Sequence, residues 1–97
     1  MIVSFGDQAT EDLYLNRPSR RARRFPSEIV GSALVKLDML EAAGAVIDLA
    51  APPGNRFEAL RGDLAGLYSI RVNERWRIVF RWDKNNARDV RLTDYHK

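Results

Sequence analysis

The spacing of apolar residues changes near the middle of the chain, from a helical period to strict alternation. After Pro26, which suits a first helical turn, apolar residues recur every three or four positions as far as Leu40. This spacing predicts an amphipathic helix that ends at Gly44, a residue type common at helix C-caps. Its buried face is expected to consist of Ile29, Val30, Ala33, Leu34, Leu37 and Leu40.

A shorter helix is expected before it. Asp7 and Thr10 are both suitable N-caps, and the helix should run to about Asn16, burying Leu13. Pro18 ends it, because the residue before a proline avoids the helical region. The remaining expected elements of this half are a strand over 2–5, one or two helical turns over 45–50 and a loop over 52–55.

From residue 56 onward apolar and polar residues alternate, which predicts β-strands. Each strand then has one apolar face, and all of these faces must be buried against the helices. The pattern therefore predicts an α+β fold, with the N-terminal helices packed on one face of a small antiparallel sheet. The strands are expected over 56–60, 67–73, 76–82 and 87–93, with a turn at 61–66.

Alignment of the apolar rows on neighbouring strands predicts the register of the sheet. Val72 beside Trp76 leaves residues 73–75 as a hairpin loop. Arg71 then lies opposite Arg77. The last two strands are expected to align Phe80 with Val90, Val79 with Arg91, Ile78 with Leu92 and Arg77 with Thr93.

The other face of the predicted sheet gathers arginines, and we call it the arginine face. Like charges placed directly across two strands destabilise a sheet, so this clustering favours a role in phosphate binding. The alternative is that the arginine stems merely cover the surface of the sheet. The residues of this face are Arg71, Arg77, Arg81 and Arg91, with Arg75 at the hairpin end.

Composition narrows the functional classes. The 97 residues, 45% apolar and 30% charged, suit a single globular domain over 1–97. No apolar run is long enough to span a membrane and no signal peptide is visible, so we expect a cytoplasmic protein without a membrane partner. The net charge of +3 comes from thirteen arginines and three lysines against thirteen acidic residues. This balance favours an acidic partner, nucleic acid first, although a GC-rich genome also enriches arginine.

The segment Asp94-Tyr95-His96 combines three side-chain types that serve as general acids or bases, and His96 is the only histidine. The predicted register brings this segment to the hairpin end of the arginine face, provided that the chain bends or bulges after Thr93. Acid–base groups beside cations can cleave RNA without a metal. No metal-ligand spacing is recognisable, so neither a metal nor another cofactor is expected. A binding surface without catalysis is the alternative.

Several stretches resemble a known family. PPGNRFEALRGDLAGLYSIRVNERWRIVFRW (52–82) and DVRLTDYH (89–96) resemble the HigB toxins, the plasmid-maintenance-killer family of the RelE/ParE superfamily. KLDMLEAA (36–43) and DLAAPPGN (48–55) match as well, and the resemblance is weakest over 6–30. It implies a RelE-like, microbial ribonuclease-like fold and a toxin of a type II toxin–antitoxin pair that cuts mRNA in the A site of the 70S ribosome. It also implies a HigA-like helix-turn-helix antitoxin, through which alone the pair would contact operator DNA.

The same resemblance implies roles for individual residues. Arg71 and Arg77 match positions that hold phosphates, and Arg61 stands where the family often has a lysine or another polar residue near the RNA. The chain departs from the family over 56–60, where some members carry a second histidine, so the division between general base and general acid is left open. The expected site consists of His96, Asp94, Tyr95 and Arg77 for catalysis, and of Arg71, Arg61, Arg75, Arg81 and Arg91 for RNA and phosphate binding, with no metal ligand.

Five further arginines lie between the two expected helices, at 17, 20, 21, 23 and 24. They form either a solvated connecting loop or a surface that docks on ribosomal RNA or on the antitoxin.

Two other functions are considered for the whole chain. A ParE-like toxin poisons DNA gyrase by binding alone, and the segment 94–96 argues against it because such a toxin needs no titrating cluster. An inactive homologue that only partners the antitoxin is the other alternative.

Overall fold

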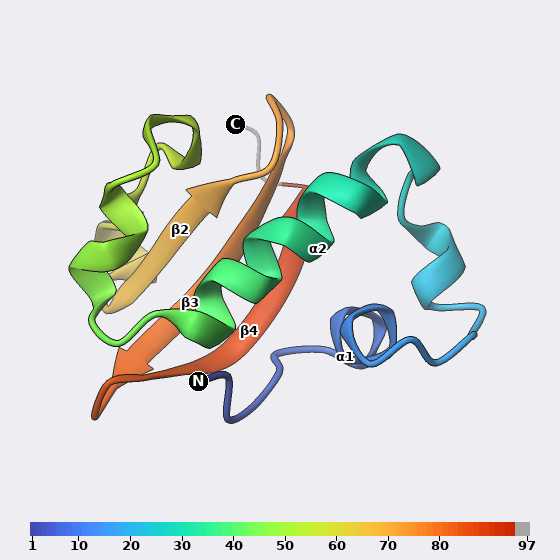
Figure 1. The fold of residues 1–97 in the computed structure, drawn as a ribbon, viewed down its shortest axis with the longest axis horizontal. Coiled ribbons are helices and arrows are strands. Elements are labelled where there is room, and N and C mark those ends of the chain that lie inside the picture. The colour runs from blue at the N-terminus through green and yellow to red at the C-terminus, as the bar shows by residue number, and fades with distance from the viewer. Residues whose placement is uncertain (95–97) are drawn as a thin grey trace.

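The computed structural model describes residues 1–94, which form two α-helices and a four-stranded antiparallel sheet (Figure 1). The predicted α+β class is confirmed. No helix within residues 1–94 is long and apolar enough to cross a bilayer. The main elements are α1 (Gln8–Tyr14), α2 (Ser27–Ala42), β1 (Glu58–Ala59), β2 (Leu67–Arg71), β3 (Trp76–Asp83) and β4 (Asn86–Asp94). Short 3₁₀ helices connect them: η1 (Ala22–Arg24), η2 (Val46–Ala50), η3 (Pro53–Asn55) and η4 (Gly62–Leu64).

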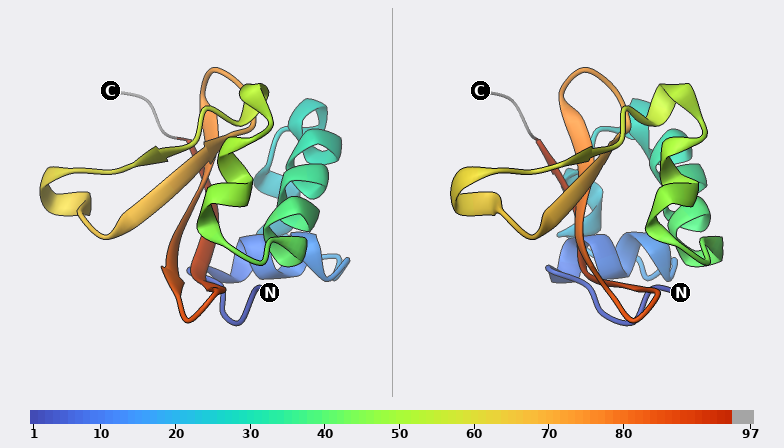
Figure 2. Two further views of the ribbon diagram at one scale, coloured as in Figure 1. Left: turned by 60° about the vertical axis from the view of Figure 1, so that its left-hand side comes forward. Right: turned by 90° about the vertical axis from the view of Figure 1, so that its left-hand side faces the viewer.

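The sheet has the strand order β1-β2-β3-β4, and both α-helices lie on the same side of it (Figure 2). The core between them includes Ile78 and Phe80 of β3, both fully buried, and the half-buried rings of Trp76 and Trp82. Since side chains alternate along a strand, the other side of β2, β3 and β4 carries the polar positions. The residues of α2 that enter the core are Ile29, Ala33, Leu37 and Leu40.

The N-terminal segment covers the free edge of β4. Ile2 and Phe5 form isolated parallel bridges to this strand, so the strand expected over 2–5 is reduced to two bridges. Asp7 caps α1, because its carboxylate accepts a hydrogen bond from the backbone N–H of Thr10 at 2.8 Å. The buried hydroxyl of Thr10 in turn accepts a hydrogen bond from the backbone N–H of Leu92 at 2.9 Å. The edge of β4 is therefore closed to further pairing.

The C-cap predicted at Gly44 lies one residue earlier, at Ala43. α2 ends at Ala42, and Ala43 already has an extended conformation, with φ −67° and ψ 129°. The carboxylate of Asp48 accepts hydrogen bonds from the backbone N–H groups of Gly44 and Ala45, at 3.1 and 3.0 Å. These bonds lead the chain directly into η2, so a glycine with positive φ is not required here.

The loop over 52–55 is anchored on α2 through Asn55. The buried side chain of Asn55 accepts a hydrogen bond from Lys36 Nζ and donates one to the carbonyl oxygen of Leu49 at 3.0 Å. Arg56 then adopts a left-handed conformation, with φ 42° and ψ 52°. Because a left-handed residue interrupts an extended strand, the strand expected over 56–60 is only the two-residue β1.

The predicted register is confirmed at the hairpin end of the sheet. The observed partners include Ile70 with Ile78, Arg71 with Arg77, Arg77 with Thr93, Ile78 with Leu92 and Val79 with Arg91.

The predicted pairing of Phe80 with Val90 is wrong, because a β-bulge shifts the register just beyond Val79. Asp89 sits in the bulge with φ 53°, a conformation that Asp tolerates better than most residues. The backbone N–H of Val90 donates to the carbonyl oxygen of Ser4 at 3.1 Å. The N-terminal segment thus supplies hydrogen bonds where the ladder to β3 is interrupted.

Candidate RNA-binding and catalytic site

The hairpin end of the arginine face brings the two expected phosphate ligands together. Arg71 and Arg77 are direct cross-strand partners, and Thr93 of β4 lies opposite Arg77 on the other side. Residues paired in this way project from the same face of a sheet, here the face turned away from the α-helices. An anion bound at this point would relieve the repulsion between the two guanidinium groups.

Groups from three other segments hold the side chain of Arg77. Its Nε donates a hydrogen bond to the hydroxyl of the fully buried Ser69 at 2.9 Å, and its Nη2 donates to the carbonyl oxygen of Arg56 at 2.7 Å. The same Nη2 lies 3.7 Å from the carboxylate of Glu58. Only 12% of the side chain is exposed. The guanidinium is therefore oriented in advance, and the alternative of a structural role gains support for this residue.

Arg71 differs from its partner. It is half-buried, and among the residues that the structure describes it forms no ion pair. Its donors are not engaged by a carboxylate, so a phosphate can be bound without breaking an existing ion pair. Of the two arginines, Arg71 is the one whose charge is not paired with a carboxylate of the described residues, and Arg77 is the one held in place by its neighbours.

Asp94 reaches the same end of the sheet. β4 continues to Asp94, which pairs with Trp76, so the bend expected after Thr93 does not occur as far as Asp94. Since paired residues project from the same face, Asp94 lies on the helical side of the sheet with Trp76 and not on the arginine face. The carboxylate of Asp94 accepts a hydrogen bond from Arg75 Nη2 at 2.6 Å. Arg75 is thus bound to the carboxylate of Asp94, and a phosphate would have to compete with that ion pair.

The other two acid–base candidates, Tyr95 and His96, lie outside the described residues. Within residues 1–94, no group of three or more histidine and carboxylate side chains is arranged to hold a metal ion.

The remaining arginines lie farther from the hairpin end of the sheet. Arg81 and Arg91 line a hollow of about 280 Å³ beside the bulge, where Arg81 Nε lies 3.5 Å from the carboxylate of Asp89. Arg81 is four residues from Arg77 along β3, roughly 13 Å at the usual rise of a strand. Arg61 is exposed in the loop before η4. The expected RNA ligands therefore fall into two groups on the arginine face and one residue in a loop.

The sequence interpretation missed the partners of Arg77. Ser69 lies on the arginine face and is fully buried, as is its cross-strand neighbour Val79, which is 2% exposed. The alternation pattern already assigned both residues to this face. The available signal for a partner of Arg77 was the small hydroxyl side chain of Ser69 in the next residue pair on the same face. The contact with the Arg56 carbonyl had no such signal, because it depends on the left-handed turn there.

Comparison with known families decides the classification. The model of the RelE-like toxin of the type II toxin–antitoxin system HigB matches residues 3–96. The chain belongs to the HigB-like toxin family. Toxin HigB-1 of Vibrio cholerae serotype O1 (strain ATCC 39315 / El Tor Inaba N16961) is 43% identical over 97 residues, which cover 100% of this chain and 99% of that protein. The resemblance inferred from the motifs is thus confirmed.

The fold of this HigB-like toxin is shared with solved toxins of Staphylococcus aureus. The structure of the YoeB dimer matches with a TM-score of 0.63 and 24% identity, over 100% of this chain and 98% of that one. The YoeB–YefM complex matches with a TM-score of 0.61 and 20% identity, over 100% and 99% of the two chains. At these identities the likeness establishes the RelE-like fold.

Proposed function

We propose that this HigB-like toxin is a ribosome-dependent endoribonuclease that cleaves translated mRNA in the A site by metal-free acid–base catalysis. The observation that supports the proposal is the direct cross-strand pairing of Arg71 and Arg77 at the hairpin end of the arginine face, the end of the sheet that Asp94 also reaches. A pair of adjacent cations suits the phosphate of a phosphodiester that is attacked by its own 2′-hydroxyl.

The reaction needs a base for the 2′-hydroxyl proton, an acid for the leaving 5′-oxygen and cations for the charge that develops on phosphorus. Arg71 binds the phosphate, and Arg77, fixed by Ser69, stabilises the developing negative charge. His96 takes one of the two proton-transfer roles, and Asp94 or Tyr95 takes the other. Tyr95 and His96 enter this scheme through the family motif.

The ribosome completes the site. A chain with a single histidine offers one near-neutral acid–base group, so precise placement of the RNA has to supply the rest of the rate enhancement. Ribosome-bound mRNA is held in a defined geometry, and this target places the activity in the cytoplasm. A HigA-like helix-turn-helix antitoxin neutralises the toxin and connects the pair to operator DNA.

The proposal is tested with purified toxin, labelled mRNA and translating ribosomes, beside the same mRNA free in solution. Cleavage is expected only on ribosomes. His96→Gln removes a titrating group and should lower the rate by about 10²–10⁴-fold. Arg71→Gln should also lower it, whereas Arg88→Gln removes an exposed arginine at the far end of β4 and should leave it unchanged.

Two outcomes would contradict the proposal in different ways. Efficient cleavage of free mRNA would overturn the ribosome dependence and keep the nuclease. Intact mRNA together with inhibited DNA gyrase would favour the ParE-like alternative.

A further inference from the structure

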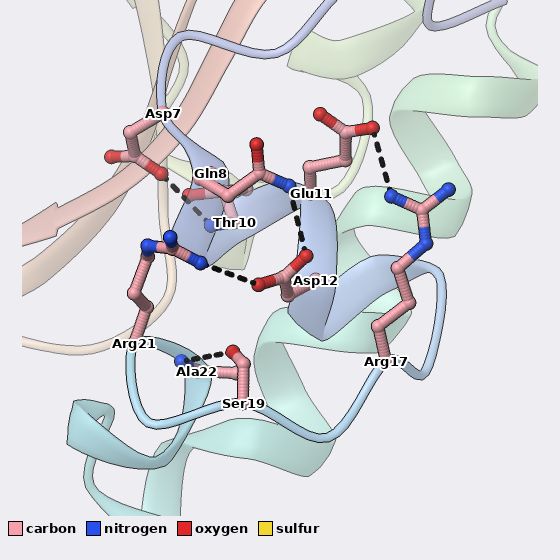
Figure 3. A network of polar contacts seen from close by, with 9 residues as sticks. All are labelled: Asp7, Gln8, Thr10, Glu11, Asp12, Arg17, Ser19, Arg21 and Ala22. Carbon is pink, nitrogen blue, oxygen red and sulfur yellow. Dashed lines mark hydrogen bonds and ion pairs between the residues drawn. The ribbon is translucent and has the colours of Figure 1, made fainter.

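The segment between α1 and α2 is a fixed structure rather than a loose connection, and we call its residues 17–24 the arginine loop. The carboxylate of Asp12, whose side chain is 6% exposed, accepts a hydrogen bond from Gln8 Nε2 at 2.9 Å and lies 3.6 Å from Arg21 Nη1 (Figure 3). The backbone carbonyl of Asp12 accepts a hydrogen bond from the N–H of Arg17 at 2.8 Å. The Ser19 hydroxyl accepts one at 3.0 Å from the N–H of Ala22, the first residue of η1.

These contacts leave part of the charge of the arginine loop unpaired. Arg17 is bound to Glu11 at 3.2 Å and Arg21 to Asp12 (Figure 3). The other three arginines are exposed, and within the described part of the chain they form no ion pair. They are Arg20, Arg23 and Arg24.

Beside these cations the surface is hollowed. A hollow of about 460 Å³ lies between α1, the arginine loop and the start of α2, and apolar side chains form much of its wall. This volume falls within the range of about 300–1,000 Å³ typical of binding pockets. The apolar members of the wall are Leu13, Pro18, Ala22, Phe25 and Val30.

We propose that the arginine loop and this hollow dock an acidic, amphipathic segment of the antitoxin. One apolar side chain of the segment fills the hollow, and carboxylates beside it pair with Arg20, Arg23 and Arg24. The inference rests on the proposed pairing with an antitoxin and adds the place and the chemistry of the contact.

Two features of the surface favour a protein segment over RNA. Phosphates would use the cations but gain nothing from an apolar hollow, whereas a buried apolar anchor surrounded by charged contacts is typical of protein interfaces. The loop is also fixed before binding, which lowers the entropic cost of forming an interface. The surface belongs to the helical side of the molecule, away from the arginine face (Figure 2).

The test measures the affinity of the full chain for the antitoxin encoded beside it, by isothermal titration calorimetry. Arg23→Glu reverses one unpaired charge, and Ala22→Trp fills the hollow without changing the charge. Each is expected to weaken binding at least tenfold, because like charges and steric overlap both oppose an interface. Arg88→Glu makes the same charge reversal on β4 and should change the affinity less than threefold. Circular dichroism confirms that each variant is folded.

Each alternative has its own outcome. If all three variants bind as tightly as the unaltered chain, the antitoxin docks elsewhere, and the pairing in the proposed function stands without this inference. If the unaltered chain does not bind the antitoxin at all, the pairing itself fails. If Arg23→Glu and Ala22→Trp lose ribosome binding while their affinity for the antitoxin is unchanged, the surface binds ribosomal RNA. A dimer of the chain alone that dissociates in Arg23→Glu would assign it to a second copy. The last two results overturn the proposal.

Discussion

Replacing Arg77 with alanine should destabilise the fold, whereas replacing its cross-strand partner Arg71 should not. Arg77 is 12% exposed and donates to the hydroxyl of Ser69, which is fully buried. Loss of a hydrogen bond to a charged group, with a buried hydroxyl left unpaired, costs roughly 2–4 kcal/mol. For a domain of this size that amounts to a fall in Tm of roughly 10–20 °C. Arg71 is half-buried and forms no ion pair within residues 1–94, so Arg71→Ala should cost less than about 1 kcal/mol.

The free energy of unfolding is measured by urea denaturation followed by tryptophan fluorescence, and cleavage activity is measured on the same preparations. Both variants should lose activity, and only Arg77→Ala should lose stability. A double-mutant cycle with Ser69→Ala isolates the contact: the combined loss should fall short of the sum of the single losses by about 1 kcal/mol or more. Additive losses, or an Arg77→Ala variant as stable as the unaltered protein, would refute the clamping of Arg77 by Ser69.

Three further predictions concern the fold. Phe80→Ala should lower the free energy of unfolding by about 3–5 kcal/mol, and Trp76→Ala should lower it by less, because Phe80 is fully buried and Trp76 only half-buried. If urea denaturation gave the reversed order, the core would be centred at the hairpin end. Gly6→Ala should destabilise the protein, because the added Cβ would lie 2.7 Å from the carbonyl oxygen of Asp89. Its control is Gly31→Ala in α2, where an added Cβ meets nothing within 4 Å and a higher helix propensity should raise the stability by about 0.5–1 kcal/mol. Equal Tm values for the two variants would contradict the close approach of Gly6 to Asp89. Hydrogen bonds from Gln8 and Ser19, aided by the charges of Arg21 and Arg17, hold the pKa of Asp12 below its ordinary value of 3.8. Because its pKa is lowered in the folded state, this carboxylate stabilises the fold above pH 3.8 and loses that effect as the pH falls through the folded pKa. The difference in unfolding free energy between the unaltered chain and Asp12→Asn should therefore disappear in acid. A difference that stays constant with pH would argue against the lowered pKa of Asp12.

The parts of the fold that follow from burial could be predicted from the sequence. Apolar rows on neighbouring strands must face the same helices, so aligning Val72 with Trp76 predicted the pairing of Arg71 with Arg77 that the structure shows. The same reasoning placed Asp94 at the hairpin end, where it binds Arg75.

The features that were missed depend on single backbone conformations. Asp89 and Arg56 both have positive φ, and apolar periodicity does not indicate a left-handed residue at either position. The first accompanies the bulge that shifts the register between Val79 and Arg81, and the second shortens β1 and turns the Arg56 carbonyl toward Arg77. The end of α2 was missed by one residue because of a side-chain contact: the carboxylate of Asp48, four residues beyond Gly44, accepts hydrogen bonds from the backbone N–H groups of Gly44 and Ala45 and leads the chain into η2.

The most direct test of the central claim is a transcriptome-wide map of mRNA 5′ ends after brief induction of the toxin in growing cells. Ribosome-dependent cleavage predicts new 5′ ends inside translated coding regions, in a fixed frame relative to the codons. These ends should disappear in Arg71→Ala, in His96→Gln and in messages that lack a start codon. Intact messages accompanied by double-strand DNA breaks, or cuts spread equally over untranslated RNA, would contradict the account.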